Sequence, residues 1–443
     1  MSGLHGPIPE SDELARRAAE LIRARLANDP GVGRTAEPAA VTSLLDGAIT
    51  DDGLGVDGAW ARFADVVVPH GFSLDSSRFL AFIPASPSVA SVWMDAVVGA
   101  MTFSAESWLE APGAVAAERQ VLELFAREAG FPADAGGCFM TGGSIGNLSA
   151  LAVARDQAGG RRRVLVADTA HASVANALHL LGMEATIVPT GADCRLTAGA
   201  LRAAVGGLGD VAAIVASAGS TNAGVVDDLA GCASVAEECG AWMHVDGAYG
   251  LAAMLLPELR RRFDGIERAD SFIVDPHKWL FAPLGSCALV YRRPWLAREL
   301  HTQRGPYIDV LHNDGDAYNP SDLGFQLTRR ASGLPVWFAL ALHGVDAHRD
   351  AMRRSLDLAR SLAAAIDSLP HADVVLPPEL GVVLFRRDGW GAAEWTRWAM
   401  RLLDDQIAYV APTTHRGEPV GRVVFLHPET PPTIIDELAA SLS

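Results

Sequence analysis

A single lysine, Lys278, occurs in this chain of 443 residues, in which lysine and arginine together number 36. Arginine stays protonated and cannot form an imine, whereas a lysine amine can lose its proton and attack a carbonyl. Lys278 follows the apolar run 271–274 and stands between Pro276-His277 and Trp279-Leu280. The alternative is that a compositional bias toward arginine left one lysine at an ordinary surface position. A surface lysine is less expected in this apolar setting. We therefore predict that Lys278 is a covalent catalyst.

Residues 140–147, Met-Thr-Gly-Gly-Ser-Ile-Gly-Asn, follow a short apolar run and open a helical stretch over 148–158. Glycines let the backbone approach an anion, and the N–H groups at a helix start favour phosphate. The segment predicts a phosphate site at Gly143 and Ser144, although a tight turn with a helix cap explains it equally well. It matches neither the Walker A nor the GxGxxG pattern, which argues against a nucleotide.

Two further candidates stand where predicted strands end. Asp246 ends the run 241–245, at the edge where open parallel sheets bind their ligands. A carboxylate there can keep a heterocyclic nitrogen protonated, as a pyridine cofactor acting as an electron sink requires; a structural acid paired with arginine is the alternative. His171 follows the run 164–167 and can stack on a planar ligand, although a lone histidine is more often a cap or a satisfied polar group.

Two loop residues complete the candidate set. Thr221, in the segment 219–224 after the run 211–215, can contact the polar edge of a ligand or simply form a turn. Tyr307 leads into the polar segment 312–322, which we predict to be a mobile loop. Such loops can close over an active site and carry an acid.

The elements that must position these residues alternate along the chain. Short β-rich runs at 164–167, 185–188, 211–215, 241–245 and 271–274 are separated by helical stretches, which predicts an α/β domain with buried parallel strands. A helix over 11–26 has one apolar face and requires a partner surface. Helical and strand-like segments over 352–426 predict a small α+β domain. We therefore expect an N-terminal helical segment over 1–88, a large domain over 89–345 and a small domain over 346–443.

Composition narrows the partners. A formal charge of −17 and a pI near 5.2 argue against nucleic acid and anionic membranes, so small molecules are the expected ligands. The sequence shows neither a signal-like start nor an apolar stretch long enough for a bilayer, which predicts a cytoplasmic protein. Five cysteines without metal-type spacing predict reduced, packed thiols and no metal site.

Taken together and in this order, these segments resemble the group II pyridoxal-phosphate-dependent amino-acid decarboxylases, the family of aromatic-amino-acid, glutamate and histidine decarboxylases. The likeness runs from about residue 77 to residue 428, and its most specific piece is Asp-Pro-His-Lys-Trp at 275–279. It implies pyridoxal 5'-phosphate as cofactor and the fold-type I architecture. That architecture has a mostly parallel central sheet of the seven-stranded type, helices on both faces and a small C-terminal domain. The N-terminal segment would clasp a second copy in a homodimer with active sites at the interface.

The resemblance also implies a reaction, the decarboxylation of an L-amino acid to its amine and CO2. Lys278 would hold the cofactor as an internal aldimine, and Tyr307, 29 residues further on, would deliver the proton to Cα. The other implied roles concern the cofactor: phosphate contacts at Gly143, Ser144 and His277, ring stacking at His171, the pyridine nitrogen at Asp246 and the polar edge at Thr221.

The likeness is loose over 103–112, where members of the family line the substrate pocket. Glu106 falls where aromatic-amino-acid decarboxylases have an aromatic residue. We predict that it faces a polar or cationic substrate side chain; pairing with an arginine, or pointing elsewhere, explains it equally well. Phe82, Ile83 and Pro84 match other pocket positions of the family, or they are plain core.

Three alternatives to simple decarboxylation stay open. The enzyme could couple decarboxylation to oxidative deamination and yield an aldehyde, an activity that often accompanies phenylalanine in place of the loop tyrosine, which is intact here. It could be an aminotransferase of the same fold. It could also be a catalytically inactive scaffold, but such a protein could dispense with Lys278, Asp246 and His171, all of which are present.

Overall fold

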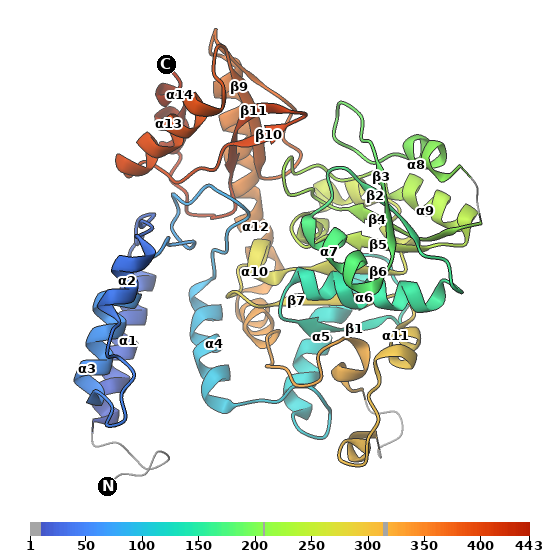
Figure 1. The fold of residues 1–443 in the computed structure, drawn as a ribbon, viewed down its shortest axis with the longest axis horizontal. Helices are drawn as coiled ribbons and strands as arrows, with labels where there is room; N and C mark the ends of the chain where they lie inside the picture. The colour runs from blue at the N-terminus through green and yellow to red at the C-terminus, as the bar shows by residue number, and fades with distance from the viewer. Residues whose placement is uncertain (1–9, 207–208, 313–317) are drawn as a thin grey trace.

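The computed structural model describes residues 10–206, 209–312 and 318–443, and a seven-stranded sheet lies at its centre (Figure 1). The sheet has the order β1-β7-β6-β5-β4-β2-β3, and β7 alone runs against the other strands. This is the mostly parallel sheet that was predicted. Its strands are β1 Gly136–Met140, β2 Arg163–Ala167, β3 Glu184–Val188, β4 Val211–Ser217, β5 Trp242–Asp246, β6 Ser271–Val274 and β7 Cys287–Tyr291.

Helices cover both faces of this sheet. Alternate residues of β2 point to opposite sides, so that Leu165 belongs to one apolar core and Val164 to the other. The first core packs against α5 Pro112–Glu128, α8 Ala198–Val205 and α9 Leu229–Cys239, and the second against α6 Gly143–Gln157, α7 Ala172–Leu181 and α11 Pro294–His301. Figure 1 shows the sheet lying between these layers. The short helix α10 Pro276–Trp279 and 3-10 turns over 250–268 follow the inner strands.

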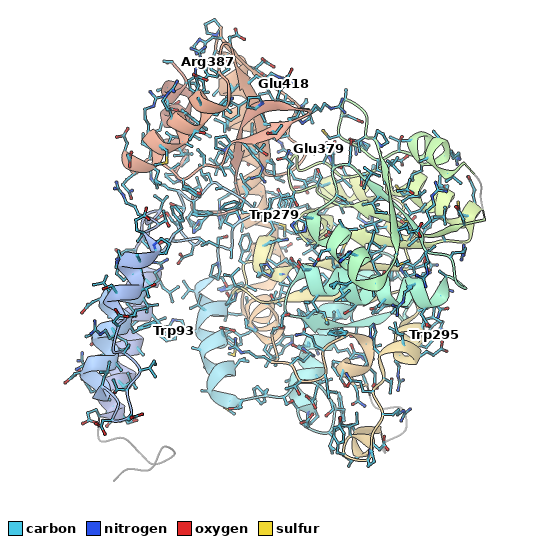
Figure 2. The ribbon with its side chains drawn as sticks, viewed as in Figure 1. Trp93, Trp279, Trp295, Glu379, Arg387 and Glu418 are labelled. Atoms are coloured by element: carbon cyan, nitrogen blue, oxygen red, sulfur yellow. The ribbon has the colours of Figure 1, made fainter. Side chains whose placement is uncertain are left out.

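A long helix, α12 Leu334–Asp367, leads from this domain to a second sheet, and its backbone leaves helical geometry at Gly344. The second sheet is antiparallel, with the order β10-β11-β9-β8. Its elements are β8 Ala372–Val374, β9 Val382–Arg387, α13 Ala392–Asp404, β10 Thr413–His415, β11 Glu418–Val424 and α14 Ile434–Ser441. Glu379, labelled at the junction of the two sheets in Figure 2, pairs with Arg195 and Arg262 of the large domain. The domain boundaries themselves stay a prediction.

The first three α-helices contribute no buried residue. They are α1 Ser11–Ala27, α2 Pro38–Leu44 and α3 Gly55–Arg62, and a fourth helix, α4 Val89–Met101, follows. In Figure 1 the first three form a blue layer beside the body. A groove of about 990 Å³ is lined by α1, by residues 86–89 and by α12. Within the described residues, no helix is long and apolar enough to cross a membrane.

Candidate active site

A cavity of about 430 Å³ opens at the carboxyl ends of the inner strands. Seven of the predicted residues line it, which brings together segments more than a hundred residues apart in the sequence. They are Gly143, Ser144, His171, Thr221, Asp246, His277 and Lys278.

Asp246 ends β5 and is held in place by a chain of hydrogen bonds. Its Oδ2 accepts from Asn147 Nδ2 at 2.9 Å and its Oδ1 from the Ala248 N–H at 3.2 Å. Asn147 Oδ1 in turn lies 2.9 Å from Nε2 of His244. Burial lowers the pKa of His244 to about 4, so its ring is neutral and donates to Asn147 from Nε2. The carboxylate is therefore fixed in orientation before any ligand arrives.

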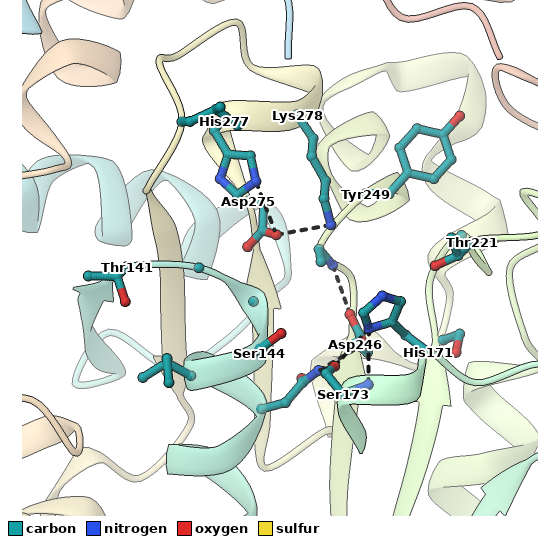
Figure 3. A pocket seen from close by; sticks show the side chains of 18 of the residues that line it. Thr141, Ser144, His171, Ser173, Thr221, Asp246, Tyr249, Asp275, His277 and Lys278 are labelled. Carbon is teal, nitrogen blue, oxygen red and sulfur yellow. Dashed lines mark hydrogen bonds and ion pairs between the residues drawn. The ribbon is translucent and has the colours of Figure 1, made fainter. Parts of the chain in front are cut away.

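His171 is the N-cap of α7, and its Nδ1 accepts from the Ser173 N–H at 3.2 Å. The same Nδ1 lies 2.8 Å from Ser173 Oγ, and that hydroxyl accepts from Asn147 at 3.0 Å. His171 can therefore cap α7 and still contact a bound ligand. Its ring lies beside Asp246 in Figure 3, where it can stack on a planar group bound over the carboxylate.

Lys278 lies on the first turn of α10, where Pro276 occupies a position that needs no N–H. Its Nζ lies 3.0 Å from Asp275 Oδ2 (Figure 3). Burial lowers the pKa of Lys278, but the Asp275 and Asp246 carboxylates raise it more, and the pKa ends above its ordinary value. Without a ligand the amine is therefore held as an ammonium ion.

The start of α6 forms a close-packed cradle. A Cβ at Gly143 would lie 2.9 Å from Asp275 Oδ2, and one at Gly146 would lie 2.9 Å from Cys287 Sγ, so both positions require glycine. The first N–H groups of a helix lack intrahelical partners and can bind an anion. His277, whose Nδ1 lies 2.6 Å from the Ser286 carbonyl oxygen, borders the same cavity.

These side chains fit pyridoxal 5'-phosphate. The cavity offers a lysine amine for its aldehyde, an oriented carboxylate for its ring nitrogen, an imidazole for its ring face and a glycine-lined helix start for its phosphate. Nowhere in the described part of the chain do three or more His, Cys, Asp or Glu side chains gather as a metal site would require. All five cysteines are buried and free.

The loop tyrosine and the predicted substrate-pocket residues of this chain do not line its cavity. Tyr307 is 79% exposed and Phe82 is 58% exposed. Ile83 packs against the main core, and Pro84 is buried. Glu106 is 8% exposed and lies beside Glu110, whose pKa is raised by burial and by the charge of Glu106.

Sequence reasoning missed several residues of the site. Asn147 and Asp275 stand inside the two motifs that were singled out, but Asn147 was considered only as a possible helix cap and Asp275 was given no role. Arg422 is 5% exposed and donates to the carbonyl oxygens of Phe82, Thr221 and Asn222, which ties three segments together at the edge of the cavity. Burial lowers its pKa to about 10. An arginine opening the apolar run 422–426 was the available signal.

Comparison with known proteins agrees with this geometry. The pyridoxal-dependent decarboxylase conserved domain matches residues 38–388. An aromatic-L-amino-acid decarboxylase of Bacillus atrophaeus is 31% identical over 71% of this chain and 68% of its own length. An L-2,4-diaminobutyrate decarboxylase of Rhizobium meliloti is 29% identical over 87% of this chain and 81% of its own. The crystal structure of Oryza sativa TDC with PLP and tryptamine superimposes with a TM-score of 0.90, at 25% identity and 98% coverage of both chains.

The domain match covers well over half of the chain, and the relatives are named decarboxylases. The chain belongs to the pyridoxal-dependent decarboxylase family and is a pyridoxal-phosphate-dependent amino-acid decarboxylase.

Proposed function

We propose that the chain removes the α-carboxylate of an L-amino acid as CO2 and releases the amine, with Lys278 as the residue that carries the cofactor. The observation that supports this most directly is the convergence of Lys278, Asp246 and His171 on one cavity at the end of the sheet. Lys278 is the chain's one lysine, so no other side chain can supply the amine.

Pyridoxal phosphate supplies an electron sink for the bond that breaks at Cα. The protein's side chains have to orient the cofactor and keep its ring nitrogen protonated. Asp246, which Asn147 orients, would keep the ring nitrogen protonated. His171 would cover one ring face, and the start of α6 with His277 would hold the phosphate. Thr221 would contact the polar edge of the ring.

We propose that the active unit is a homodimer in which Tyr307 acts on the cavity of the partner subunit. Tyr307 is 79% exposed and lies outside the cavity of its own chain. Helices α1 to α3 bury none of their residues, and apolar side chains such as Ile49, Phe63 and Val67 are exposed around them. Apolar surface of this kind is typical of a subunit interface. With its hydroxyl intact, Tyr307 would protonate Cα, which favours an amine over an aldehyde as product.

Product analysis tests this function. The holoenzyme is incubated with a mixture of L-amino acids and a 2-oxo acid as amino-group acceptor, and mass spectrometry follows the amines, aldehydes and oxo acids that form. We expect one amino acid to be consumed with stoichiometric CO2 and the matching amine. An oxo acid without CO2 would identify an aminotransferase, and no product from any amino acid would favour the scaffold alternative.

We further propose that Glu106 selects a substrate with a cationic side chain. Glu106 is 8% exposed, and in the described part of the chain no arginine or lysine forms a salt bridge with it or with Glu110. Glu106 is hydrogen-bonded to Glu110, so the two carboxyl groups partner each other but no cation, and a positive charge from elsewhere would stabilise them. The neighbouring face carries exposed apolar side chains, including Trp108 and Leu109, which a second subunit would cover. The diaminobutyrate decarboxylase relative is named for a substrate with a second amine.

Changing Glu106 to glutamine should reduce kcat/KM for basic amino acids by about 10- to 100-fold relative to aromatic ones, since a charged hydrogen bond contributes about 1.5–3 kcal/mol. The measurement is a competition between the two substrate classes at fixed cofactor saturation. Glu110→Gln is the matched control, because it neutralises the adjacent carboxylate. An unchanged preference in Glu106→Gln, or an equal change in both variants, would remove Glu106 as the selecting residue.

A further inference from the structure

Asp275 holds the Lys278 ammonium with one carboxylate oxygen and leaves the other without a partner. Asp275 Oδ2 lies 3.0 Å from Lys278 Nζ, and the side chain is 2% exposed. Asp275 Oδ1 is buried and has no hydrogen-bond partner among the described residues. A buried polar atom without a partner costs about 1–3 kcal/mol, so its persistence beside a ligand cavity indicates a function.

The groups that face this carboxylate, or the ammonium paired with it, come from four elements. From α10, Lys278 contacts it and His277 Nε2 lies 3.8 Å from Oδ2. From β7, Cys287 adjoins it, and burial raises the pKa of that thiol well above its usual range, so it stays neutral. From β5, Asp246 acts on Lys278 through its charge. From α6, the backbone of Gly143 comes so close that a Cβ there would lie 3.2 Å from Oδ1.

This arrangement poses two chemical problems for loading the cofactor. The Lys278 ammonium has no lone pair and must lose a proton before it can attack an aldehyde. In addition, Asp275 lies against the helix start that we assign to the phosphate, and an ionised carboxylate would repel that anion. One proton transfer solves both problems, because it frees the amine and neutralises the acid.

We propose that Asp275 is the base that takes the proton of Lys278 when pyridoxal phosphate is loaded, and that it then stays protonated beside the phosphate. One proton passes from Nζ to Asp275. The amine lone pair forms a bond to the aldehyde carbon, and the aldehyde oxygen leaves as water with the two remaining amine hydrogens. Asp275 can then donate its new O–H to a phosphate oxygen. This inference rests on the proposed roles of Lys278 and of the α6 start.

Infrared difference spectroscopy of the wild-type protein tests the protonation directly. Holoenzyme minus cofactor-free enzyme should show a gained carbonyl stretching band of a carboxylic acid and a lost carboxylate band. The gained band should shift in D2O and be absent in Asp275→Asn. Asp275→Glu, which keeps the carboxyl group, should retain a band at a moved position. A wild-type spectrum without a gained acid band overturns the proposal, whatever the variants do.

Rates of cofactor capture and release test the base itself. General bases contribute roughly 10²–10⁴-fold, so Asp275→Asn should capture pyridoxal phosphate at least about 100-fold more slowly at a pH at which its Lys278 is still protonated. Release should slow by a similar factor, because a base that passes a proton accelerates both directions, and the equilibrium affinity should change far less. Capture by the variant should rise with pH, since its amine must lose the proton to solvent, whereas wild-type capture should be nearly flat around neutrality.

Cys232→Ala is the control, since it removes a buried thiol on α9 that does not line the cavity and leaves the proton path intact. It should capture the cofactor at close to the wild-type rate. Slower capture with faster release in Asp275→Asn would mean that Asp275 merely organises the site, and would overturn the proposal. Such a result would leave amine production by the wild-type enzyme untouched, so it is distinguishable from a failure of the proposed decarboxylase function.

Discussion

Replacing Lys278 with arginine should lower amine formation by roughly 10⁴-fold or more and remove the absorption band of the lysine-bound cofactor. Arginine keeps the positive charge and can still pair with Asp275, 3.0 Å from the present amine, so the change isolates the loss of the nucleophile. Losses of this size are typical when the covalent residue of an enzyme is removed. The measurements are product formation and a visible absorption spectrum after incubation with pyridoxal phosphate.

Because the chain has one lysine, covalent labelling of the cofactor-binding residue has a single expected product. Borohydride reduction of the native holoenzyme should attach the cofactor to one peptide, the one that contains Lys278, because no other lysine exists. Arg16→Lys is a suitable control: it adds a lysine at an exposed position of α1, and that lysine should stay unlabelled. A reduced adduct at another residue, or full activity in Lys278→Arg, would contradict the proposed function.

Most of the central sheet could be predicted from short apolar runs, since strands buried on both faces are apolar throughout. β4 is the clearest case, because all seven of its residues are buried. β7 was missed although all five of its residues are buried, and β1 was missed because its two glycines disfavour a strand. The structure shows why they occur: a Cβ at Gly137 would lie 1.8 Å from the Leu289 carbonyl oxygen of β7. This close approach between two strands is a tertiary constraint that local sequence does not reveal.

The long helix α12 was predicted only in its second half, over 352–369. Its first half contains Pro335 and Gly344, which are poor helix formers in isolation. Pro335 is tolerated because it lies in the first turn, where no backbone donor is needed. The backbone departs from helical geometry at Gly344, with φ 76°, and the helical path resumes beyond it.

The residues predicted for the cofactor side line one cavity, because they stand at strand ends and helix starts, which sequence patterns locate. Asp275 escaped notice for a different reason. Both Asp246 and Asp275 end predicted strands, and no sequence pattern tells which carboxylate faces the lysine amine. The structure separates them: Asp275 pairs with Lys278, and Asp246 is held by Asn147.

The structure of one chain says least about the residues that contact the substrate. Tyr307, Phe82 and Glu106 were assigned by resemblance, and none of them lines the cavity of its own subunit. The proposed homodimer would account for the exposure of Tyr307 and Phe82, because residues contributed to a partner's site lie on the outer surface of one chain.

Replacing Tyr307 with phenylalanine should reduce amine formation by about 10²–10³-fold, because the ring remains but the proton donor is lost. Part of the flux should then appear as aldehyde. In that route, oxygen is reduced to hydrogen peroxide while the substrate loses CO2 and ammonia and gains the oxygen atom of water. The measurements are amine and aldehyde by mass spectrometry and oxygen uptake with an electrode. An unaltered amine yield would show that Tyr307 is not the proton donor.

Mixed dimers show which subunit's tyrosine acts. One subunit carries Lys278→Arg and the other Tyr307→Phe, and the two are co-expressed with different tags so that the mixed species can be purified. If Tyr307 serves the partner, the subunit that keeps its lysine receives an intact tyrosine from its neighbour. The mixed dimer then has one complete site out of two, and it should form amine at about half the wild-type rate per dimer. If Tyr307 serves its own subunit, neither site is complete and the rate should not exceed that of the Tyr307→Phe parent. Because the two arrangements differ by about two orders of magnitude in rate, this experiment decides between them even with incomplete purification.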